Sequence, residues 1–152
     1  MHPARLEVTD ALLVASRALV GVAARSLADI DVTLPQFRAL VLIGSRSRTT
    51  VSDLAAALGS HPTSVTRLCD RLVRRRLIRR SEAAEDRRET DLHLTAAGRR
   101  LVERVTDRRR RDLAVIASHM SDDEAQAAVG AFKAFAAAAE QSHATADLFG
   151  WP

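Results

Sequence analysis

The chain has 152 residues, of which 47% are hydrophobic and 28% charged, enough for one folded domain with a substantial core. Its formal net charge of +4 favours an anionic partner. A single cysteine, Cys69, excludes an internal disulfide and a CxxC metal site, and no apolar stretch reaches the roughly 18 residues of a membrane span. The start of the chain lacks a signal-peptide pattern, so we expect a cytoplasmic protein.

Two helices are predicted in the first third of the chain. Apolar residues repeat at helical spacing over residues 9–30, which predicts an amphipathic helix there. Thr33 can cap a second helix, in which Pro35 is tolerated in the first turn and Gln36 completes a capping box. This second helix is predicted to end at Gly44.

A helix-turn-helix pattern follows in the middle of the chain. Thr50 precedes a short helix that ends at Gly59, and after a turn containing Pro62 a second helix is predicted to run to about Arg75. A short helix, a turn and a second helix form the arrangement with which many proteins place one helix in the major groove of DNA.

The second helix of this pair has two different faces. One face is apolar and consists of Val65, Leu68, Cys69 and Leu72. The opposite face and its flanks are polar and consist of Thr63, Ser64, Thr66, Arg67, Asp70, Arg71 and Arg74. Arginine can bridge the O6 and N7 atoms of guanine, while serine and threonine can contact bases or phosphates. An ordinary amphipathic surface helix has the same pattern, so the neighbouring elements decide between the two interpretations.

A hairpin and two further helices are predicted in the second half of the chain. Residues 77–81 and 90–94 have strand character, and the polar, charged segment between them makes the pair a β-hairpin wing. A long helix is predicted over residues 95–119. The last helix, over residues 121–141, starts with a well-formed capping box.

Positive charge is concentrated in one part of the chain. Sixteen arginines and eight acidic residues lie between Arg67 and Arg111, so this segment carries a formal +8. An arginine-favouring genome would account for 22 arginines against one lysine, Lys133, but not for where the arginines lie. Localised charge of this kind is typical of nucleic-acid binding. The run Arg108–Arg111 is instead predicted to be a solvated face paired with acids such as Asp107.

Four stretches, in their order and spacing, resemble the MarR family of bacterial regulators. They are Leu54-Ala55 with Leu58-Gly59 in the first helix of the motif, Pro62 to Leu72 in the recognition helix, Asp86-Arg87-Arg88 in the wing, and Leu94-Thr95-Ala96-Ala97-Gly98 at the wing exit. The resemblance covers roughly residues 8–141.

This resemblance implies a mainly α fold with a small β-hairpin wing: a winged helix-turn-helix plus a helical dimerisation lobe. The DNA-binding lobe would span residues 34–95, the dimerisation lobe residues 1–33 and 96–145, and residues 146–152 would be a frayed tail. The family pattern also implies a homodimer that binds double-stranded DNA at a pseudo-palindromic site, with half-sites about 10 bp apart.

The resemblance further implies roles for individual residues. Arg88, with Arg87 beside it, would reach the minor groove from the wing, and Asp86 would hold the wing by pairing with an arginine. The recognition-helix residues expected to contact DNA are Thr63, Ser64, Thr66, Arg67, Arg71 and, nearer the backbone, Arg74. A small anionic or aromatic effector would bind between the lobes, in a pocket lined by Arg17, Phe37, Arg38 and Val41.

Three positions depart from the family pattern. Arg76 stands where glycine is common before the first wing strand, so we expect a different helix end there. Ser60 stands where an apolar residue is common and His61 where serine is common, which leaves the cap of the recognition helix undecided.

Other candidate sites are weak. Cys69 lies toward the apolar face, where a buried thiol is inert, so we expect a packing role rather than redox sensing. The five histidines are scattered, with no His-x-x-x-His pair, and predict no metal site. No phosphate-binding glycine loop, metalloprotease motif or nucleophile elbow occurs, so we expect neither catalysis nor a cofactor.

The sequence therefore predicts a sequence-specific DNA-binding transcriptional regulator that acts as a repressor. The alternative is a protein that binds nucleic acid by charge with little sequence preference, such as an architectural or RNA-binding protein. A third interpretation is a ligand- or metal-sensing module whose DNA binding is vestigial.

Overall fold

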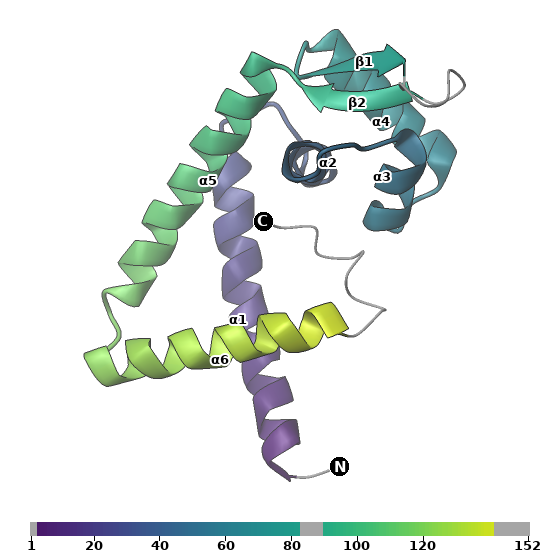
Figure 1. Ribbon diagram of the computed structural model, residues 1–152. Helices are drawn as coiled ribbons and strands as arrows, with labels where there is room; N and C mark the ends of the chain where they lie inside the picture. Colours follow the sequence, from purple (N-terminus) through teal and green to yellow (C-terminus); the bar gives the residue numbers. More distant parts are fainter. Residues whose placement is uncertain (1–2, 83–89, 142–152) are drawn as a thin grey trace.

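The computed structural model describes residues 3–82 and 90–141. Within them the chain forms six helices and one two-stranded antiparallel sheet (Figure 1). The elements are α1 (Pro3–Leu27), α2 (Leu34–Ser45), α3 (Val51–Leu58), α4 (Pro62–Arg74), β1 (Ile78–Glu82), β2 (Thr90–Leu94), α5 (Ala96–Ala117) and α6 (Asp122–Gln141). The predicted mainly α fold with a winged helix-turn-helix is confirmed.

The first helix does not have the predicted bounds of 9–30. It begins at Pro3, which is tolerated in the first turn of a helix because its missing N–H would have had no partner there. It ends at Leu27, after which tight turns take over and the Ile30 N–H donates to the Leu27 carbonyl at 3.0 Å. The apolar repeat misled the prediction because Ile30 packs against the core from the turn. None of the helices in the described residues is both long and apolar enough to cross a membrane.

Three helices begin with reciprocal capping boxes at starts that the sequence predicted: Thr33–Gln36, Thr50–Asp53 and Ser121–Glu124. At α3, the Thr50 N–H donates to the Asp53 carboxylate at 2.9 Å, and the Asp53 N–H donates to Thr50 Oγ1 at 3.2 Å. The hydrogen bonds from Thr50 lower the pKa of Asp53. α3 ends at Gly59, whose φ of 57° is the left-handed conformation that glycine adopts without strain. Local chemistry therefore fixes both ends of α3.

One apolar core holds α2, α3, α4 and the hairpin together. Its fully buried side chains include Phe37 and Leu40 of α2, Leu54 of α3, Leu72 of α4 and Leu92 of β2. Burial of one such side chain contributes about 1.5–3 kcal/mol. The position of α4 relative to the hairpin is therefore set by packing from every neighbouring element.

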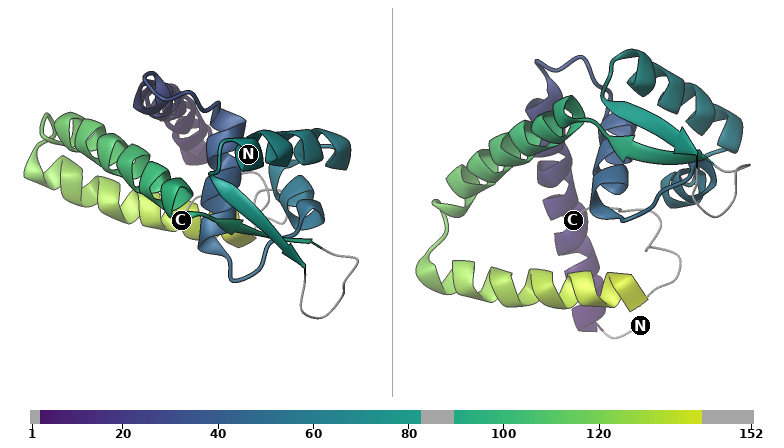
Figure 2. Two further views of the ribbon diagram at one scale, coloured as in Figure 1. Left: turned by 90° about the horizontal axis from the view of Figure 1, so that it is seen from above. Right: turned by 45° about the horizontal axis from the view of Figure 1, so that its top comes forward.

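The hairpin pairs β1 with β2 in a register that places Ile78 opposite Leu94. β2 has its predicted bounds, whereas β1 starts one residue later than predicted, because Leu77 belongs to the turn that ends α4. The segment before α3 adds a hydrogen bond to this sheet, from the Leu92 N–H to the Thr49 carbonyl at 2.8 Å. The end of the hairpin opposite its connections to α4 and α5 points away from the long helices α1, α5 and α6 (Figure 2).

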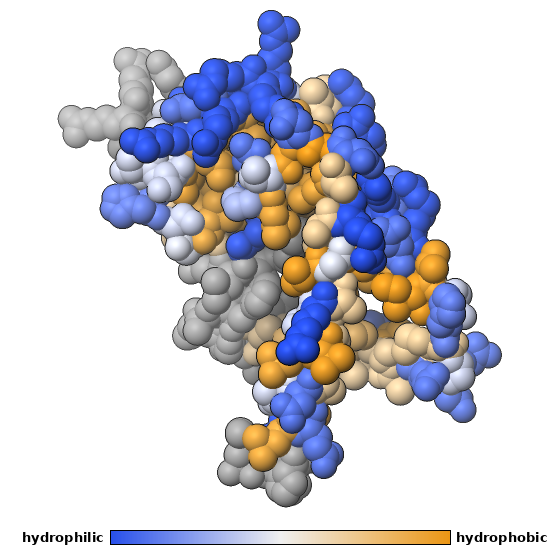
Figure 3. Space-filling view, turned by 180° about the vertical axis from the view of Figure 1, so that it is seen from behind, coloured by the Kyte–Doolittle hydropathy of each residue, from blue (hydrophilic) through white to orange (hydrophobic). Residues whose placement is uncertain are grey.

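The long helices leave much apolar surface uncovered. α1 packs along α5, and α6 crosses the far end of α1 in the view of Figure 1. Large apolar side chains are exposed on α1 and α6, including Val14 (66%), Val20 (63%), Phe132 (51%) and Phe135 (49%). Figure 3 shows hydrophilic residues gathered over the winged helix and hydrophobic patches along the long helices.

The turn between α4 and β1 is left-handed at Arg76, with a φ of 56°. The Leu77 N–H donates to the Leu72 carbonyl at 3.0 Å, the hydrogen bond expected when a helix ends in a left-handed residue. The expectation that arginine would change this helix end was wrong. The Arg76 side chain is exposed, and the turn forms although the left-handed conformation costs a non-glycine residue about 1–2 kcal/mol.

The start of α5 is hydrogen bonded to the same turn. Thr95 Oγ1 lies 2.7 Å from the Arg76 carbonyl oxygen, and the Thr95 N–H donates to the Leu77 carbonyl at 3.0 Å. Gly98, in the first turn of α5, lies so close to Leu77 that a Cβ atom on it would overlap the Leu77 carbonyl oxygen. The end of α4 and the start of α5 are therefore joined by backbone contacts that leave no space for a side chain.

Replacing Gly98 with alanine is expected to lower the free energy of unfolding by about 3 kcal/mol, because the added methyl group would force α5 away from the turn after α4. The matched control is Gly130→Ala in α6, where a Cβ atom would meet nothing within 4 Å. That substitution should raise the free energy of unfolding by about 0.5–1 kcal/mol, since alanine is the better helix former. Urea unfolding followed by circular dichroism at one protein concentration measures both, and equal effects would contradict the tight joint.

Candidate nucleic-acid interface

α4, the recognition helix of the helix-turn-helix, has the two faces that the sequence predicted. The six residues expected to contact DNA are all exposed: Thr63, Ser64, Thr66, Arg67, Arg71 and Arg74. The four residues of the apolar face are all buried: Val65, Leu68, Cys69 and Leu72. The helix therefore presents a row of hydroxyl and guanidinium groups to solvent while its other side is fixed in the core.

The start of α4 has no side-chain cap. His61 occupies the cap position, but its side chain makes no hydrogen bond to the helix. The cap that the sequence left undecided is therefore absent at the side-chain level. Its carbonyl accepts from the Ser64 N–H at 2.9 Å, and Thr66 Oγ1 donates to the Pro62 carbonyl at 3.0 Å. The first turn is thus free of a carboxylate or hydroxyl cap that an incoming phosphate would have to displace.

An ion pair that the sequence did not reveal ties α4 to the hairpin. Arg80 Nη2 of β1 donates to the Asp70 carboxylate at 2.8 Å. Both side chains are partly exposed, so the pair contributes at most about 1 kcal/mol to stability. Asp70 is the only carboxylate in α4, and its neutralisation removes a charge that would repel a phosphate. The two residues are ten positions apart and meet only because β1 folds back beside the helix.

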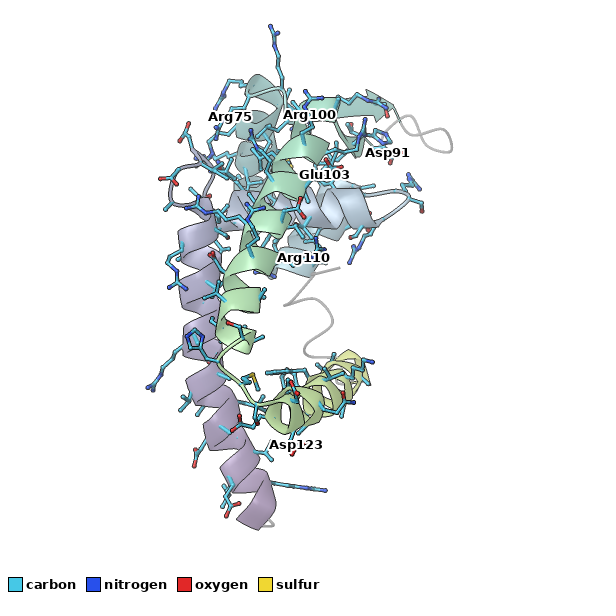
Figure 4. All side chains as sticks on the ribbon, turned by 90° about the vertical axis from the view of Figure 1, so that its left-hand side faces the viewer. Arg75, Asp91, Arg100, Glu103, Arg110 and Asp123 are labelled. Carbon is cyan, nitrogen blue, oxygen red and sulfur yellow. The ribbon has the colours of Figure 1, made fainter. Side chains whose placement is uncertain are left out.

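A second ion pair links the loop before α3 to the hairpin. Arg48 Nε donates to the carboxylate of Asp91, which is labelled in Figure 4, at 2.9 Å. The Asp91 side chain is only 14% exposed. Thr50 forms an isolated antiparallel bridge with Asp91 in the same place. The base of the wing is therefore anchored to the helix-turn-helix on both strands, through Asp70 on one side and Arg48 on the other.

The wing residues Asp86, Arg87 and Arg88 lie outside the described residues. Their predicted roles, with Asp86 holding the wing and the two arginines reaching the minor groove, stay predictions.

The arginine run on α5 is divided among three environments. Arg110 pairs with Asp107 at 2.8 Å, as expected of a solvated face, and Arg108 reaches Asp29 in the loop after α1 at 2.9 Å. Arg109 is different: its guanidinium carbon lies 5.8 Å from the centre of the Phe37 ring, and burial lowers the pKa of Arg109. The expectation of one solvated face was wrong for Arg109, because successive helix residues are about 100° apart and one member of the run must face inward.

A cavity of about 540 Å³, open to solvent, lies between α1, α2, α5 and α6. Its large apolar lining residues include Leu12, Leu19, Leu113, Phe132 and Phe135. Two arginines, Arg38 and Arg109, also line it. The cavity is therefore an apolar space with guanidinium groups at its wall.

Only one of the four residues expected to line an effector pocket is in this lining. Arg38 is there, whereas Phe37 and Val41 are buried in the core at 0% and 3% exposure, and Arg17 is on the exposed side of α1. The sequence could not assign these residues because it does not show which side of α2 packs on the core. It also gave no indication that α6 would supply phenylalanines to the cavity.

Known proteins share this sequence pattern and fold. The sequence profile of the MarR family matches residues 30–89. The solved structure of RV1404 from Mycobacterium tuberculosis is 41% identical, with a TM-score of 0.78, and the match covers 86% of this chain and 91% of that one. A MarR family protein from Bacillus stearothermophilus is 25% identical, with a TM-score of 0.80, over 89% and 95% of the two chains.

The chain belongs to the MarR family. A further relative, the uncharacterised HTH-type transcriptional regulator YhbI of Bacillus subtilis, is 36% identical over 78 residues. This match covers 51% of each chain, so the chain spans about half the length of that relative. The resemblance of the sequence to the MarR family is thus confirmed, and YhbI is a relative named as a transcriptional regulator.

The structure gives a physical reason for the MarR family stretch at the wing exit. Thr95 and Gly98 form the joint between the turn after α4 and α5. Leu94 packs against the last turn of α2, where a Cβ atom on Gly44 would lie 2.7 Å from Leu94 Cδ1. The leucine, threonine and glycine of this stretch therefore connect the wing to α2, to α4 and to α5.

No cluster of three or more histidine, cysteine, aspartate or glutamate side chains that could hold a metal ion occurs among the residues that the structure describes.

Cys69 should be unreactive in the folded MarR family protein. Its side chain is fully buried, and desolvation raises the pKa of the thiol to about 11. Because the thiolate is the reactive form, labelling by iodoacetamide at pH 8 should be at least about 100-fold slower in the folded protein than in urea. Mass spectrometry of timed samples measures the rate. Labelling at similar rates in both states would show that Cys69 is accessible.

Proposed function

We propose that this protein is a sequence-specific DNA-binding transcriptional regulator that acts as a repressor. The observation that carries the proposal is the two-faced recognition helix α4, with Arg67, Arg71 and Arg74 exposed opposite a fully buried apolar face. The core fixes this helix, so its exposed side chains are presented in one orientation. Its MarR family membership and the transcriptional regulator among its relatives support the same function.

In this proposal α4 enters the major groove. Thr63 and Ser64 at its start contact bases or phosphates, Arg67 and Arg71 contact guanine edges, and Arg74 contacts the backbone. Thr66 lies among them and can still accept a hydrogen bond, since its hydroxyl proton goes to the Pro62 carbonyl. A MepR mutant of S. aureus, which shares this fold at 24% identity and a TM-score of 0.65, has been solved bound to an oligodeoxyribonucleotide.

The wing supplies a second contact. Its end opposite the connections to α4 and α5 points away from the long helices (Figure 2). Arg88, with Arg87 beside it, enters the adjacent minor groove, where narrow A·T-rich stretches attract arginine. Asp86 pairs with an arginine and holds the wing.

A homodimer accounts for the apolar surface of the long helices. Val129, Phe132 and Phe135 are about half exposed on α6, and contiguous apolar patches of this kind mark interaction surfaces. Residues 1–33 and 96–145 of two copies form the dimerisation lobe in this proposal, and residues 34–95 the DNA-binding lobe. The two-fold symmetry of such a dimer calls for a pseudo-palindromic operator with half-sites about 10 bp apart.

A small anionic or aromatic ligand relieves repression in this proposal. The support is the cavity of about 540 Å³, whose apolar wall suits an aromatic ring and whose Arg38 and Arg109 suit an anionic group. Because the cavity is bounded by α2, which belongs to the proposed DNA-binding lobe, as well as by α1, α5 and α6, an occupant contacts both proposed lobes.

DNA binding is tested by selection from a random duplex pool followed by mobility-shift titration. An enriched palindrome is expected, and Arg67→Ala should weaken binding to it by about 1–3 kcal/mol and relax the preference at one base pair. Arg88→Ala should also weaken binding while the dimer remains intact. The control is Arg111→Ala, an exposed arginine on α5 away from α4. If no sequence is enriched and Arg67→Ala binds like Arg111→Ala, the protein is a non-specific nucleic-acid binder instead.

The dimer is tested by analytical ultracentrifugation. Phe132→Asp should convert the dimer to a monomer at micromolar concentration, because it places a charge in the apolar surface of α6. Lys133→Ala, the neighbouring exposed position on the same helix, should leave the dimer unchanged. A wild-type protein that sediments as a monomer would contradict the proposed lobe.

A further inference from the structure

A hollow of about 210 Å³ lies at the base of the hairpin, apart from the recognition helix and from the apolar cavity. It is lined by Ile43 and Gly44 of α2, Arg79 of β1, His93 and Leu94 of β2, and Arg99 of α5. This volume is several times the roughly 30 Å³ that one water molecule occupies in the liquid. A tetrahedral oxyanion with part of its hydration therefore fits.

The strand register brings two of the basic side chains together. Arg79 and His93 are direct cross-strand partners, so both project from the same face of the hairpin. His93 Nε2 lies 2.9 Å from Ser81 Oγ, a hydrogen bond that holds the imidazole ring in place. Arg80, the next residue after Arg79, is on the opposite face, where it pairs with Asp70 of α4. Arg79 and His93 consequently face away from the recognition helix.

The third basic group comes from α5. Arg99 Nη1 donates to the Leu94 carbonyl at 3.1 Å, which directs the guanidinium group toward the strand end and leaves its other N–H groups available. The last turn of α2 closes the hollow at Gly44, where a Cβ atom would lie 2.7 Å from Leu94 Cδ1. Three separate elements thus place two guanidinium groups and one imidazole around a single space.

The charges around the hollow are not balanced by acids. No carboxylate belongs to its lining, and within residues 3–82 and 90–141 neither Arg79 nor Arg99 forms an ion pair. Glu103, four residues after Arg99 on α5, is not paired with it, and Asp91 is held by Arg48. By contrast Arg80, Arg108 and Arg110 each meet a carboxylate within 3 Å.

We propose that this hollow binds a phosphate group through Arg79, His93 and Arg99. The planar fork of each guanidinium group can donate two hydrogen bonds to one oxyanion, and two such forks suit a doubly charged group. Two sources can supply it: a free phosphate or phosphate ester, or a backbone phosphate of bound DNA. Because the hollow faces away from α4, we expect the free anion.

Calorimetric titration of the full chain with inorganic phosphate, with chloride adjusted to constant ionic strength, tests the site. The wild type should bind phosphate, and Arg99→Gln should weaken the affinity at least tenfold. Arg79→Gln should also weaken the affinity for phosphate at least tenfold. Because the Arg79 side chain makes no hydrogen bond within the described residues, this substitution should not disturb folding, so a weaker affinity reports the loss of the phosphate contact. Arg100→Gln, the exposed neighbour of Arg99 on the same helix (Figure 4), is the matched control and should stay within twofold.

Duplex DNA distinguishes the two sources. If the hollow takes a backbone phosphate, Arg99→Gln should reduce the slope of log affinity against log salt by about 0.9, while Arg100→Gln leaves it unchanged. If it takes a free anion, the slopes stay equal and the calorimetric difference remains. The calorimetry contains no DNA, so its result stands whether or not the protein is a DNA-binding regulator. Equal behaviour of Arg99→Gln and Arg100→Gln in both measurements overturns the proposal.

Discussion

The backbone contact between Gly98 and the Leu77 carbonyl sets how the two parts of the molecule are joined. Thr95 reinforces it by binding the carbonyls of the turn that ends α4 and by capping α5. With no side chain between them, a rotation of α5 has to move the end of α4 as well. α5 belongs to the long helices and α4 carries the exposed arginines, so the joint connects these two parts of the molecule directly.

The role of each arginine depends on the partner of its side chain more than on how many arginines the chain contains. Arg80 and Arg108 neutralise carboxylates and hold elements together, whereas Arg109 is half-buried over Phe37. The arginines on the polar face of α4 are exposed and make no described ion pair with an acid, which suits contact with an external anion. One residue type, repeated 22 times, therefore serves as structural tie and as cavity wall and, in the proposed function, as contact surface. A count of charge identified the region, but only the partners separated these roles.

Much of the fold was predictable because it depends on neighbours in sequence. The capping boxes, the end of α3 at Gly59, the bounds of β2 and the two faces of α4 all follow from residue types and spacings within a few positions. The first helix was misplaced because apolar spacing does not distinguish a helix residue from a turn residue such as Ile30 that packs on the same core. Phe37 and Val41, which the sequence suggested as pocket residues, do not line the cavity, because apolar residues look identical in sequence whether they face a cavity or the interior.

The sequence by itself determined the order of the helices, the face that α4 presents and the resemblance to a family. Each of these depends on residues close together in the chain, through local hydrogen bonds at helix starts and through the helical and strand periods. The tertiary structure alone decided that Asp70 meets Arg80, that α6 supplies Phe132 to the cavity, and that Arg79, His93 and Arg99 share a hollow. Such contacts join residues on different elements, and the angles between those elements are fixed by core packing, which no single stretch of sequence contains.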